Sequence, residues 1–409
     1  MTLRASILAE APVPVEAALT RILGDLAPLA ETEPVALAAA LGRILREDVV
    51  SPLDVPGADN SAVDGYAIHA EDLAPAGETR LPVIGRAAAG HPFAAAVPRG
   101  AALRIFTGAL MPAGPDTVAM QEDCRLEGEA VVLPPGLKGG SNRRRAGEDV
   151  RTGATVLAAG LRLRPQEIGL AAAIGRSHLT VARTLRAAVF STGESRIHDS
   201  NRQGLGALLH QLGILVADGG ILSNDRARID AALKAAAVAN DVILTSGEVF
   251  HGEEDHLTAA VEALGSLRLW QLAVKPGRAL AIGELAGARR GPPVSFIGLP
   301  GNPVAAITAF LCLARPMLLR LMGAGDLTAR RYRLSAGFAH RKKPGRREFL
   351  RARLTPGGDG EVTVLTYPAQ GSGILSSLLA ADGLVELPEA LTKVERGSMV
   401  DFLPFGETG

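Results

Sequence analysis

Val294-Ser-Phe-Ile-Gly-Leu-Pro300-Gly-Asn-Pro-Val304 joins a short apolar run to a long apolar segment through a tight loop. The first six residues have the composition of a buried strand. Asn302 can accept hydrogen bonds from free amides at a helix start, and Pro303 is tolerated at the first helical position because an amide there would lack a partner. We therefore expect a strand over Val294–Leu299 and a long helix over Asn302–Leu321.

Similar units precede this stretch and predict an α/β domain. Apolar runs of strand length alternate there with segments of helical periodicity. The expected strands are Leu185–Phe190, Ile214–Asp218 and Val242–Thr245, and the expected helices are Asn201–Leu212, Arg226–Ala239 and Asp255–Leu264. Such alternation implies a mainly parallel sheet covered on both faces, and ligands bind these sheets beyond the carboxyl ends of the strands.

The segments before and after this α/β region have different sequence patterns. Helical spacing occurs at Val15–Leu26, Val35–Leu45 and Pro165–Ile174. Between them, short apolar pieces alternate with Gly/Pro turns, at Leu81–Ile84, Ala101–Phe106, Thr117–Met120 and Ala130–Leu133. β-like segments return at Arg331–Leu354, Val362–Tyr367 and Gly383–Leu387. We predict a discontinuous helical linker domain (1–50 and 145–180), an inserted β-rich domain (51–144), an α/β domain (181–328) and a C-terminal β domain (329–409).

The composition limits the possible partners. The chain has 409 residues, 47% of them hydrophobic, and a formal net charge of zero. This balance argues against nucleic acid or an anionic membrane as a partner attracted by bulk charge. Only Cys124 and Cys312 are present, without metal-ligand spacing, which argues against disulfides and zinc. We find no signal-peptide core and no apolar run of about 18 residues, so we expect a soluble cytoplasmic protein.

Three predicted strands end in loops of small or hydroxylic residues: Ser191-Thr-Gly193, Thr245-Ser-Gly247 and Pro300-Gly-Asn-Pro303. Glycine lets backbone amides approach a ligand, hydroxyls add donors, and a helix start attracts anions. For any one of these loops, ordinary turn chemistry is the favoured explanation. The three together at one sheet edge favour a phosphate-bearing ligand.

Charged residues gather in four further stretches. Asp54, Asp59, Asn60 and Asp64 lie in one Gly/Pro segment, which is either a solvated turn or a carboxylate pair for a divalent cation or proton transfer. Cations crowd the run 142–149, the turn Lys275-Pro-Gly-Arg278 and the segment 346–351. Arg is suited to bidentate phosphate binding, although such runs are usually solvated loops. The histidines form no recognisable catalytic constellation.

Eight motifs occur in the order found in one known family. They are Asp59-Asn-Ser-Ala-Val-Asp-Gly-Tyr-Ala67, Arg104-Ile-Phe-Thr-Gly-Ala109, the Arg143–Asp149 run, Ser191-Thr-Gly193, Asp199-Ser-Asn201, Lys275-Pro-Gly277, Pro300-Gly-Asn-Pro-Val304 and Gln370-Gly-Ser372. The chain thereby resembles the MoeA/gephyrin E-domain family over nearly its whole length.

This resemblance implies a fold and an activity. The fold would combine a MogA-like three-layer α/β domain, a helical linker domain with an inserted β module, and a C-terminal small β-barrel domain, in an elongated homodimer. The activity would be insertion of molybdate into adenylylated molybdopterin with release of AMP, assisted by Mg²⁺. The resemblance also implies the molybdopterin adenylyltransferase and molybdoenzyme acceptors as partners, and neither nucleic acid nor membrane.

The resemblance further implies site residues. The matched catalytic positions are Asp59, Thr107, Asp149, Asp225, Asp255, Lys275 and Arg278. The matched substrate-binding positions are Ser191, Thr192, Gly193, Glu194, Asn201, Ser246, Gly247, Pro300, Gly301, Asn302, Pro303, Arg351 and Ser372. Asp59 and Asp255 are the implied magnesium ligands. Three of these residues would act across the dimer, namely Asp59, Thr107 and Asp149. Arg351 and Ser372 would lie at the molybdate pocket.

Five positions in four motifs depart from the family pattern. The chain has Glu248 and Phe250 where the family has Gly and Ser, His256 where it has Tyr, Arg278 where it has Lys, and Ser195 where it has an acid. Ser195, Glu248 and Phe250 favour an alternative function, a molybdopterin carrier or scaffold without the chemistry. The retained residues favour the enzyme; they are Asp59, Asp149, Asp255, Lys275 and Arg351. Because a carboxylate near a diphosphate would repel it, we expect Glu248 to pair with Arg278 or Lys275, or to help hold Mg²⁺.

Overall fold

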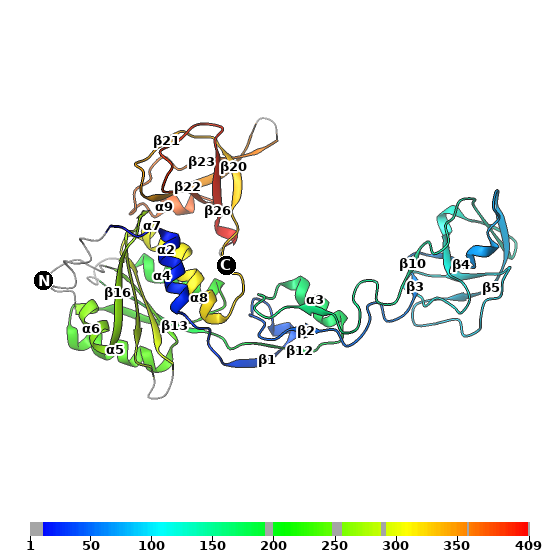
Figure 1. The fold of residues 1–409 in the computed structure, drawn as a ribbon, viewed down its shortest axis with the longest axis horizontal. Helices are drawn as coiled ribbons and strands as arrows, with labels where there is room; N and C mark the ends of the chain where they lie inside the picture. The colour runs from blue at the N-terminus through cyan, green and yellow to red at the C-terminus, as the bar shows by residue number, and fades with distance from the viewer. Residues whose placement is uncertain (1–10, 193–198, 248–255, 288–291, 358–359, 408–409) are drawn as a thin grey trace.

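The computed structural model describes residues 11–192, 199–247, 256–287, 292–357 and 360–407. The chain is elongated (Figure 1). An α/β domain and a small β barrel lie at one end, a narrow linker occupies the middle, and a separate β module lies at the other end.

The α/β domain is built on one six-stranded sheet. Its strand order is β14 (Leu215–Leu222), β13 (Arg186–Thr192), β15 (Val242–Gly247), β19 (Val294–Pro300), β18 (Ala279–Leu285) and β16 (Gly265–Gln271). The first four strands are parallel, and β18 and β16 add an antiparallel edge. The predicted strands are confirmed, whereas the sequence pattern missed β16 and β18.

Helices cover both faces of this sheet because alternate strand residues point to opposite sides. In β13, Ala187 and Val189 belong to one apolar core, which includes buried residues of α4 (Ser200–Gln211). Ala188 and Phe190 belong to a second core. The second core includes buried residues of α5 (Arg226–Ala239) and α6 (His256–Leu264). The predicted three-layer arrangement is therefore confirmed.

The long apolar segment after β19 forms three consecutive helical pieces. They are α7 (Pro303–Ala309), a π-helical turn (Phe310–Ala314) and α8 (Arg315–Met322). Pro316 explains the interruption, because it has no amide to continue the α-helical ladder. The helix Pro303–Met322 is long and apolar enough to cross a membrane, but it is mostly buried inside the protein. Its apolarity is that of a core helix.

The linker consists of short antiparallel ribbons and helix α3 (Pro165–Ala173). Strand β1 (Thr32–Ala36) pairs with β12 (His178–Ala182), and β2 (Val49–Val50) pairs with β11 (Thr155–Leu157). The prediction of a helix over Val35–Leu45 is wrong. Pairing with a strand far along the chain overrides the helical pattern of this Ala-rich segment.

Helix α2 (Val15–Asp25) confirms the first predicted helix. Its buried residues Val15, Ala18 and Ile22 share the apolar core that contains α8. The N-terminal helix therefore packs on the α/β domain, although the neighbouring residues enter the linker. The domain boundaries near residues 50, 145, 180 and 328 stay predictions.

The β module contains a second six-stranded sheet. Its order is β7 (Thr117–Met120), β4 (Gly65–Ile68), β6 (Ala102–Ile105), β5 (Thr79–Ala87), β9 (Ala130–Leu133) and β8 (Arg125–Glu127). Alternation again divides the side chains between two cores, with Leu103 and Ile105 on one face and Tyr66 and Ala102 on the other.

The C-terminal domain is a closed barrel. Strands β22 (Arg347–Pro356), β23 (Val362–Thr366), β20 (Tyr332–Ala336), β26 (Met399–Pro404) and β24 (Gly383–Leu387) pair in this order, and β24 returns to β22. The predicted small barrel is confirmed. The short strand β17 (Val274–Lys275), which precedes β18 in the chain, adds in parallel to β22 and ties the barrel to the α/β domain.

Arg347 supports this junction through buried ion pairs. Its guanidinium donates 2.7 Å to Glu386, and these two side chains are 11% and 7% exposed. The same guanidinium binds Glu389 and, in helix α2, Glu16.

Replacing Arg347 by Met should destabilise the protein by about 3 kcal/mol, because Glu386 loses one partner while it stays buried. Urea unfolding followed by circular dichroism measures this loss. The matched control is Arg333→Met, which breaks an exposed pair with Asp401 and should cost under about 1 kcal/mol. Equal losses in the two variants would contradict the assigned role of Arg347.

Candidate functional site at the carboxyl edge of the sheet

Asn201 in α4 connects two of the predicted strand-end loops. Its amide nitrogen donates 2.8 Å to the Ser246 hydroxyl and 2.6 Å to the Gly301 carbonyl. The Ser246 hydroxyl in turn donates 3.1 Å to the carbonyl of Pro300. The ends of β15 and β19 and the start of α4 therefore form one cluster, as the parallel topology predicts.

Gly247 lies against the end of β13. A Cβ atom at this position would be 1.7 Å from Thr192 Oγ1 and 2.9 Å from the Thr192 carbonyl oxygen. Thr192 Oγ1 and Thr245 Oγ1 are buried and have no hydrogen-bond partner among the described residues. Buried hydroxyls are normally satisfied, so two unpaired ones at one sheet edge suit a site that receives a ligand or water.

Asp199 organises the start of α4 and was absent from the predicted site residues. It caps the helix by accepting from the Arg202 amide at 3.1 Å, and it also accepts from the Ser191 hydroxyl and the Arg202 guanidinium. Burial alone would raise the pKa of Asp199, but these hydrogen bonds outweigh it and lower the pKa. An acid directly before a helix is the sequence signal that could have identified it.

The start of α7 is covered by a loop of the barrel. Asn302 precedes the helix as predicted, but the expected side-chain cap is wrong, because its side chain makes no capping hydrogen bond. The free amide of Val304 instead donates 3.1 Å to the carbonyl of Ser372. Gly301 and Asn302 remain exposed beside this contact.

The Lys275–Arg278 turn packs against the same helix start. Gly277 has a φ of +84°, and a Cβ atom there would lie 3.1 Å from Ala305 Cβ and 3.3 Å from Pro300 Cγ. The turn therefore needs glycine both for its backbone conformation and for its close approach to α7. The side chains of Lys275 and Arg278 are exposed at this position.

Arg351 holds the barrel loop from inside. The residue is 1% exposed, and its guanidinium donates to the carbonyls of Ala369 (3.1 Å) and Gly371 (3.0 Å) and to the Ser377 hydroxyl (3.0 Å). Burial lowers the pKa of Arg351. None of the described carboxylates forms an ion pair with it, so its positive charge lies uncompensated behind the loop that contains Ser372.

Glu348 is a second residue that the sequence reasoning missed. Its carboxylate is 4% exposed, lies 3.4 Å from Lys275 Nζ through each oxygen, and contacts His340 Nε2 at 3.1 Å. The pairing of β17 with β22 places Lys275 directly opposite Glu348. Sequence periodicity carries no signal for this contact, because the two residues are joined only by the docking of the barrel.

Asp59 and Thr107 lie together in the β module, far from the sheet edge described above (Figure 1). The Gly108 amide donates 2.8 Å to the Ser61 carbonyl, which places the loop containing Thr107 beside the loop of Asp59. Asp59 accepts from the Ala146 amide at 2.8 Å and from Arg143 Nε at 2.7 Å. The Ala146 amide is the main reason that the pKa of Asp59 is lowered.

Three further predicted residues have simple surroundings. The Thr107 amide and hydroxyl both donate to Asp64 at 2.8 Å, and these bonds lower the pKa of Asp64. Asp149 is exposed in the loop that follows Ala146. Asp225 caps α5 by accepting from the Arg228 amide at 2.9 Å. This last contact gives Asp225 a structural role at the same end of the sheet as the strand-end loops.

Of the two implied magnesium ligands, only Asp59 lies among the described residues. No group of three or more His, Cys, Asp or Glu side chains with metal-binding geometry occurs among them. Both oxygens of Asp59 already accept hydrogen bonds, one of them from a guanidinium, which leaves little capacity for a divalent cation. Asp255, the other implied ligand, lies outside the described residues, as do Gly193, Glu194, Ser195, Glu248 and Phe250.

Gly247→Ala should reduce the stability of the α/β domain by about 1–3 kcal/mol, because the added methyl group overpacks the contact with Thr192. Thermal unfolding measures this effect. Gly204→Ala in α4 is the matched control, since a Cβ atom there meets nothing within 4 Å, and it should be neutral or stabilising. A stable Gly247→Ala protein would show that the two loops are not in contact.

Three family models match successive parts of the chain. They describe the MoeA N-terminal region (domain I and II) over residues 13–175, a probable molybdopterin binding domain over residues 171–320, and the MoeA C-terminal region (domain IV) over residues 333–405. Their order agrees with the linker and β module, the α/β domain and the barrel.

Curated relatives match over nearly their full length. The chain is 34% identical over 404 residues to the molybdopterin molybdenumtransferase of Haemophilus influenzae, covering 96% of this chain and 98% of that protein. It is 33% identical to molybdopterin molybdenumtransferase 2 of Mycobacterium tuberculosis, covering 93% and 96%. The crystal structure of a molybdopterin biosynthesis moeA protein from Pyrococcus horikoshii matches with a TM-score of 0.81 and 28% identity, covering 96% and 100%. With its three-layer α/β domain, closed barrel and strand-end loops, the chain belongs to the MoeA family of molybdopterin molybdenumtransferases.

Proposed function

We propose that this enzyme of molybdenum-cofactor biosynthesis inserts molybdate into adenylylated molybdopterin and releases AMP. The observation that carries the proposal is the meeting of three anion-attracting features at one sheet edge. These are the exposed turn with Lys275 and Arg278, the start of α7 with exposed Gly301 and Asn302, and the barrel loop that covers the buried charge of Arg351.

Each feature suits a part of the reaction. Molybdate is a tetrahedral oxyanion, and hydroxyls, amides and cations bind such groups well. The Ser372 loop, held by Arg351, supports a site for molybdate beside the start of α7. Lys275 and Arg278 are available to neutralise the charge that AMP retains as it leaves. The strand-end loops that Asn201 connects suit the pterin phosphate.

Lys275 is positioned from the barrel side. Glu348 contacts the Lys275 ammonium at 3.4 Å, and the pairing of β17 with β22 fixes the position of Lys275 relative to the barrel. The docking of the barrel therefore fixes the position of Lys275, which we propose binds the nucleotide, relative to the Ser372 loop, which we propose binds molybdate. His340 shares the same carboxylate, so Lys275 does not hold the charge of Glu348 alone.

We also propose a homodimer, because the resemblance places Asp59 and Thr107 in the site of a partner chain. Within one chain the linker separates them from Lys275 (Figure 1). We further propose that the protein is cytoplasmic. It would receive the pterin nucleotide from the molybdopterin adenylyltransferase and pass the finished cofactor to molybdoenzyme acceptors. We propose that magnesium arrives with the nucleotide phosphates, since Asp59 already binds Arg143 and Ala146.

Incubation with adenylyl-molybdopterin, Mg²⁺ and molybdate should release AMP, measured by chromatography. Lys275→Ala should slow this release by about 10²-fold, because a preorganised charge at the leaving group is lost. Lys234→Ala is the control, since Lys234 is exposed on α5, away from the loops at the sheet edge.

Two other results would lead to a different function. Tight binding of adenylyl-molybdopterin without AMP release in the presence of molybdate and Mg²⁺ would identify a carrier. Unchanged turnover in Lys275→Ala would remove this residue from the site.

Mixed dimers test whether the site is shared. Asp59→Asn and Lys275→Ala homodimers should each be impaired, and a heterodimer of the two variants should regain activity, because one of its two sites has both native residues. Affinity purification with two different tags isolates this heterodimer. A purified heterodimer as inactive as its parents would show that each site is built from a single chain.

A further inference from the structure

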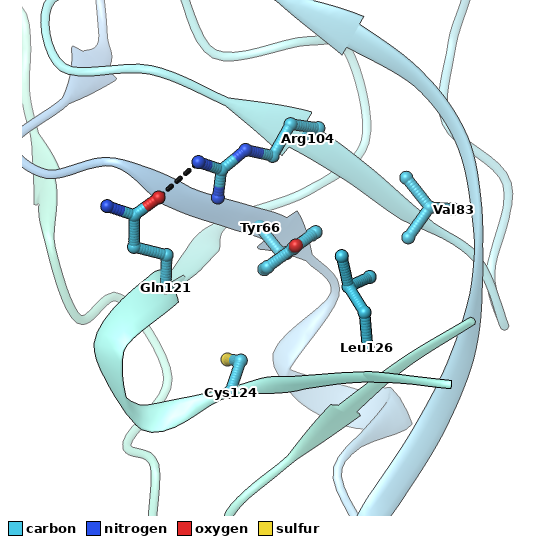
Figure 2. A pocket seen from close by; sticks show the side chains of 6 residues that line it. All are labelled: Tyr66, Val83, Arg104, Gln121, Cys124 and Leu126. Atoms are coloured by element: carbon cyan, nitrogen blue, oxygen red, sulfur yellow. Dashed lines mark hydrogen bonds between the residues drawn. The ribbon is translucent and has the colours of Figure 1, made fainter. Parts of the chain in front are cut away.

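A pocket of about 510 Å³ lies in the β module, apart from the sheet edge of the α/β domain (Figure 2). Its lining residues are Tyr66, Val83, Arg104, Gln121, Cys124 and Leu126. Tyr66 and Arg104 come from two of the eight motifs that carry the family resemblance. The proposed function uses Asp59 and Thr107 from these motifs, but neither of the two pocket residues.

Sheet register explains why Tyr66 and Arg104 meet. The two residues are paired across β4 and β6, so their side chains extend from the same face of the sheet. The guanidinium carbon of Arg104 lies 5.0 Å from the centre of the Tyr66 ring and 4.8 Å from that of Phe106. Two aromatic rings therefore fix the guanidinium in place at the pocket.

The pocket contains a cation whose hydrogen-bond acceptors are all uncharged. Arg104 donates to the carbonyl of Gly65 at 3.3 Å and to the side-chain oxygen of Gln121, and both acceptors are uncharged. Within the described residues, no carboxylate forms an ion pair with Arg104. Tyr66 is only 6% exposed, and it lines the pocket. Figure 2 places its hydroxyl among the lining side chains, between Arg104 and Leu126.

The remaining lining residues are mostly apolar. Val83 and Leu126 lie on the side away from Gln121, and the Cys124 thiol lies below the Tyr66 ring in Figure 2. Burial raises the pKa of this thiol to about 11, so it is uncharged near neutral pH. The Gln121 amide is already engaged, since it donates 3.1 Å to Glu122. The pocket thus offers one cation and one hydroxyl donor beside an apolar wall.

We propose that this pocket binds a small organic monoanion, whose carboxylate contacts Arg104 and Tyr66 and whose apolar body lies against Val83 and Leu126. A guanidinium and a hydroxyl can together satisfy one carboxylate. The apolar wall favours a ligand with a hydrocarbon or aromatic group over a bare inorganic anion. This site does not depend on the proposed transferase reaction.

Cys124 provides a direct reporter for the pocket. The chain has only two cysteines, so a Cys312→Ser background leaves Cys124 as the sole thiol. Its alkylation by iodoacetamide, followed by mass spectrometry of the full chain, should slow in a saturable way when benzoate is added. Benzyl alcohol, which lacks the charge, and inorganic phosphate, which lacks the apolar body, should protect far less.

Variants separate the two donors. Arg104→Met should weaken the protection by benzoate by about tenfold or more, because a charge-assisted hydrogen bond is lost. Tyr66→Phe keeps the ring that stacks on Arg104 and should weaken protection by about three- to tenfold through loss of the hydroxyl alone. Arg80→Met is the control, because it removes an equal charge from an exposed pair in the same module and should leave protection unchanged.

Several results would overturn the proposal. They are an absence of protection by benzoate, equal protection by benzyl alcohol or by phosphate, and equal losses in Arg80→Met and Arg104→Met. Circular dichroism confirms that each variant is folded. If Arg104→Met does not fold, Tyr66→Phe decides, and full protection in that variant would also overturn the proposal.

Discussion

The parallel pairing of β17 with β22 is the contact on which the arrangement of the candidate site depends. The two residues of β17 belong to the α/β domain by chain position and to the barrel by hydrogen bonding. Because β17 leads directly into the turn of Gly277, the pairing of β17 with the barrel also helps to place this turn on α7. Arg347 and Glu348 are the residues of β22 that pair with β17. Both are buried, and both form ion pairs that add to the strand contact.

Acidic side chains explain how a chain with no net charge can present cations at a site. Many of its aspartates accept hydrogen bonds from backbone amides in turns and at helix starts. Asp54 with Thr152 and Asp64 with Thr107 use the same arrangement, in which one carboxylate oxygen accepts from both the amide and the hydroxyl of a threonine. Asp199 and Asp225 cap helices. At the sheet edge, the described residues Lys275 and Arg278 keep exposed cationic side chains.

The elongated shape has a consequence for chemistry. A narrow linker of two-stranded ribbons has a small core of its own, and it holds the β module away from the α/β domain (Figure 1). Asp59 and Thr107 therefore lie in a part of the chain that is separate from its own α/β domain. The internal sheet of the module also forms a pocket that is lined by residues of the module itself.

Sequence by itself determined the elements whose signal is local. Strands β13, β15 and β19 are apolar because both of their faces are buried, and α5 begins at an acidic cap, so pattern alone located them. The strand-end loops could be expected at one edge because parallel strands end together. Tertiary structure decided the rest. The strand at Thr32–Ala36, the pairing of Lys275 with Glu348, the burial of Arg351 and the stacking of Tyr66 on Arg104 all depend on partners distant in the chain, and neither periodicity nor spacing encodes the identity of such a partner.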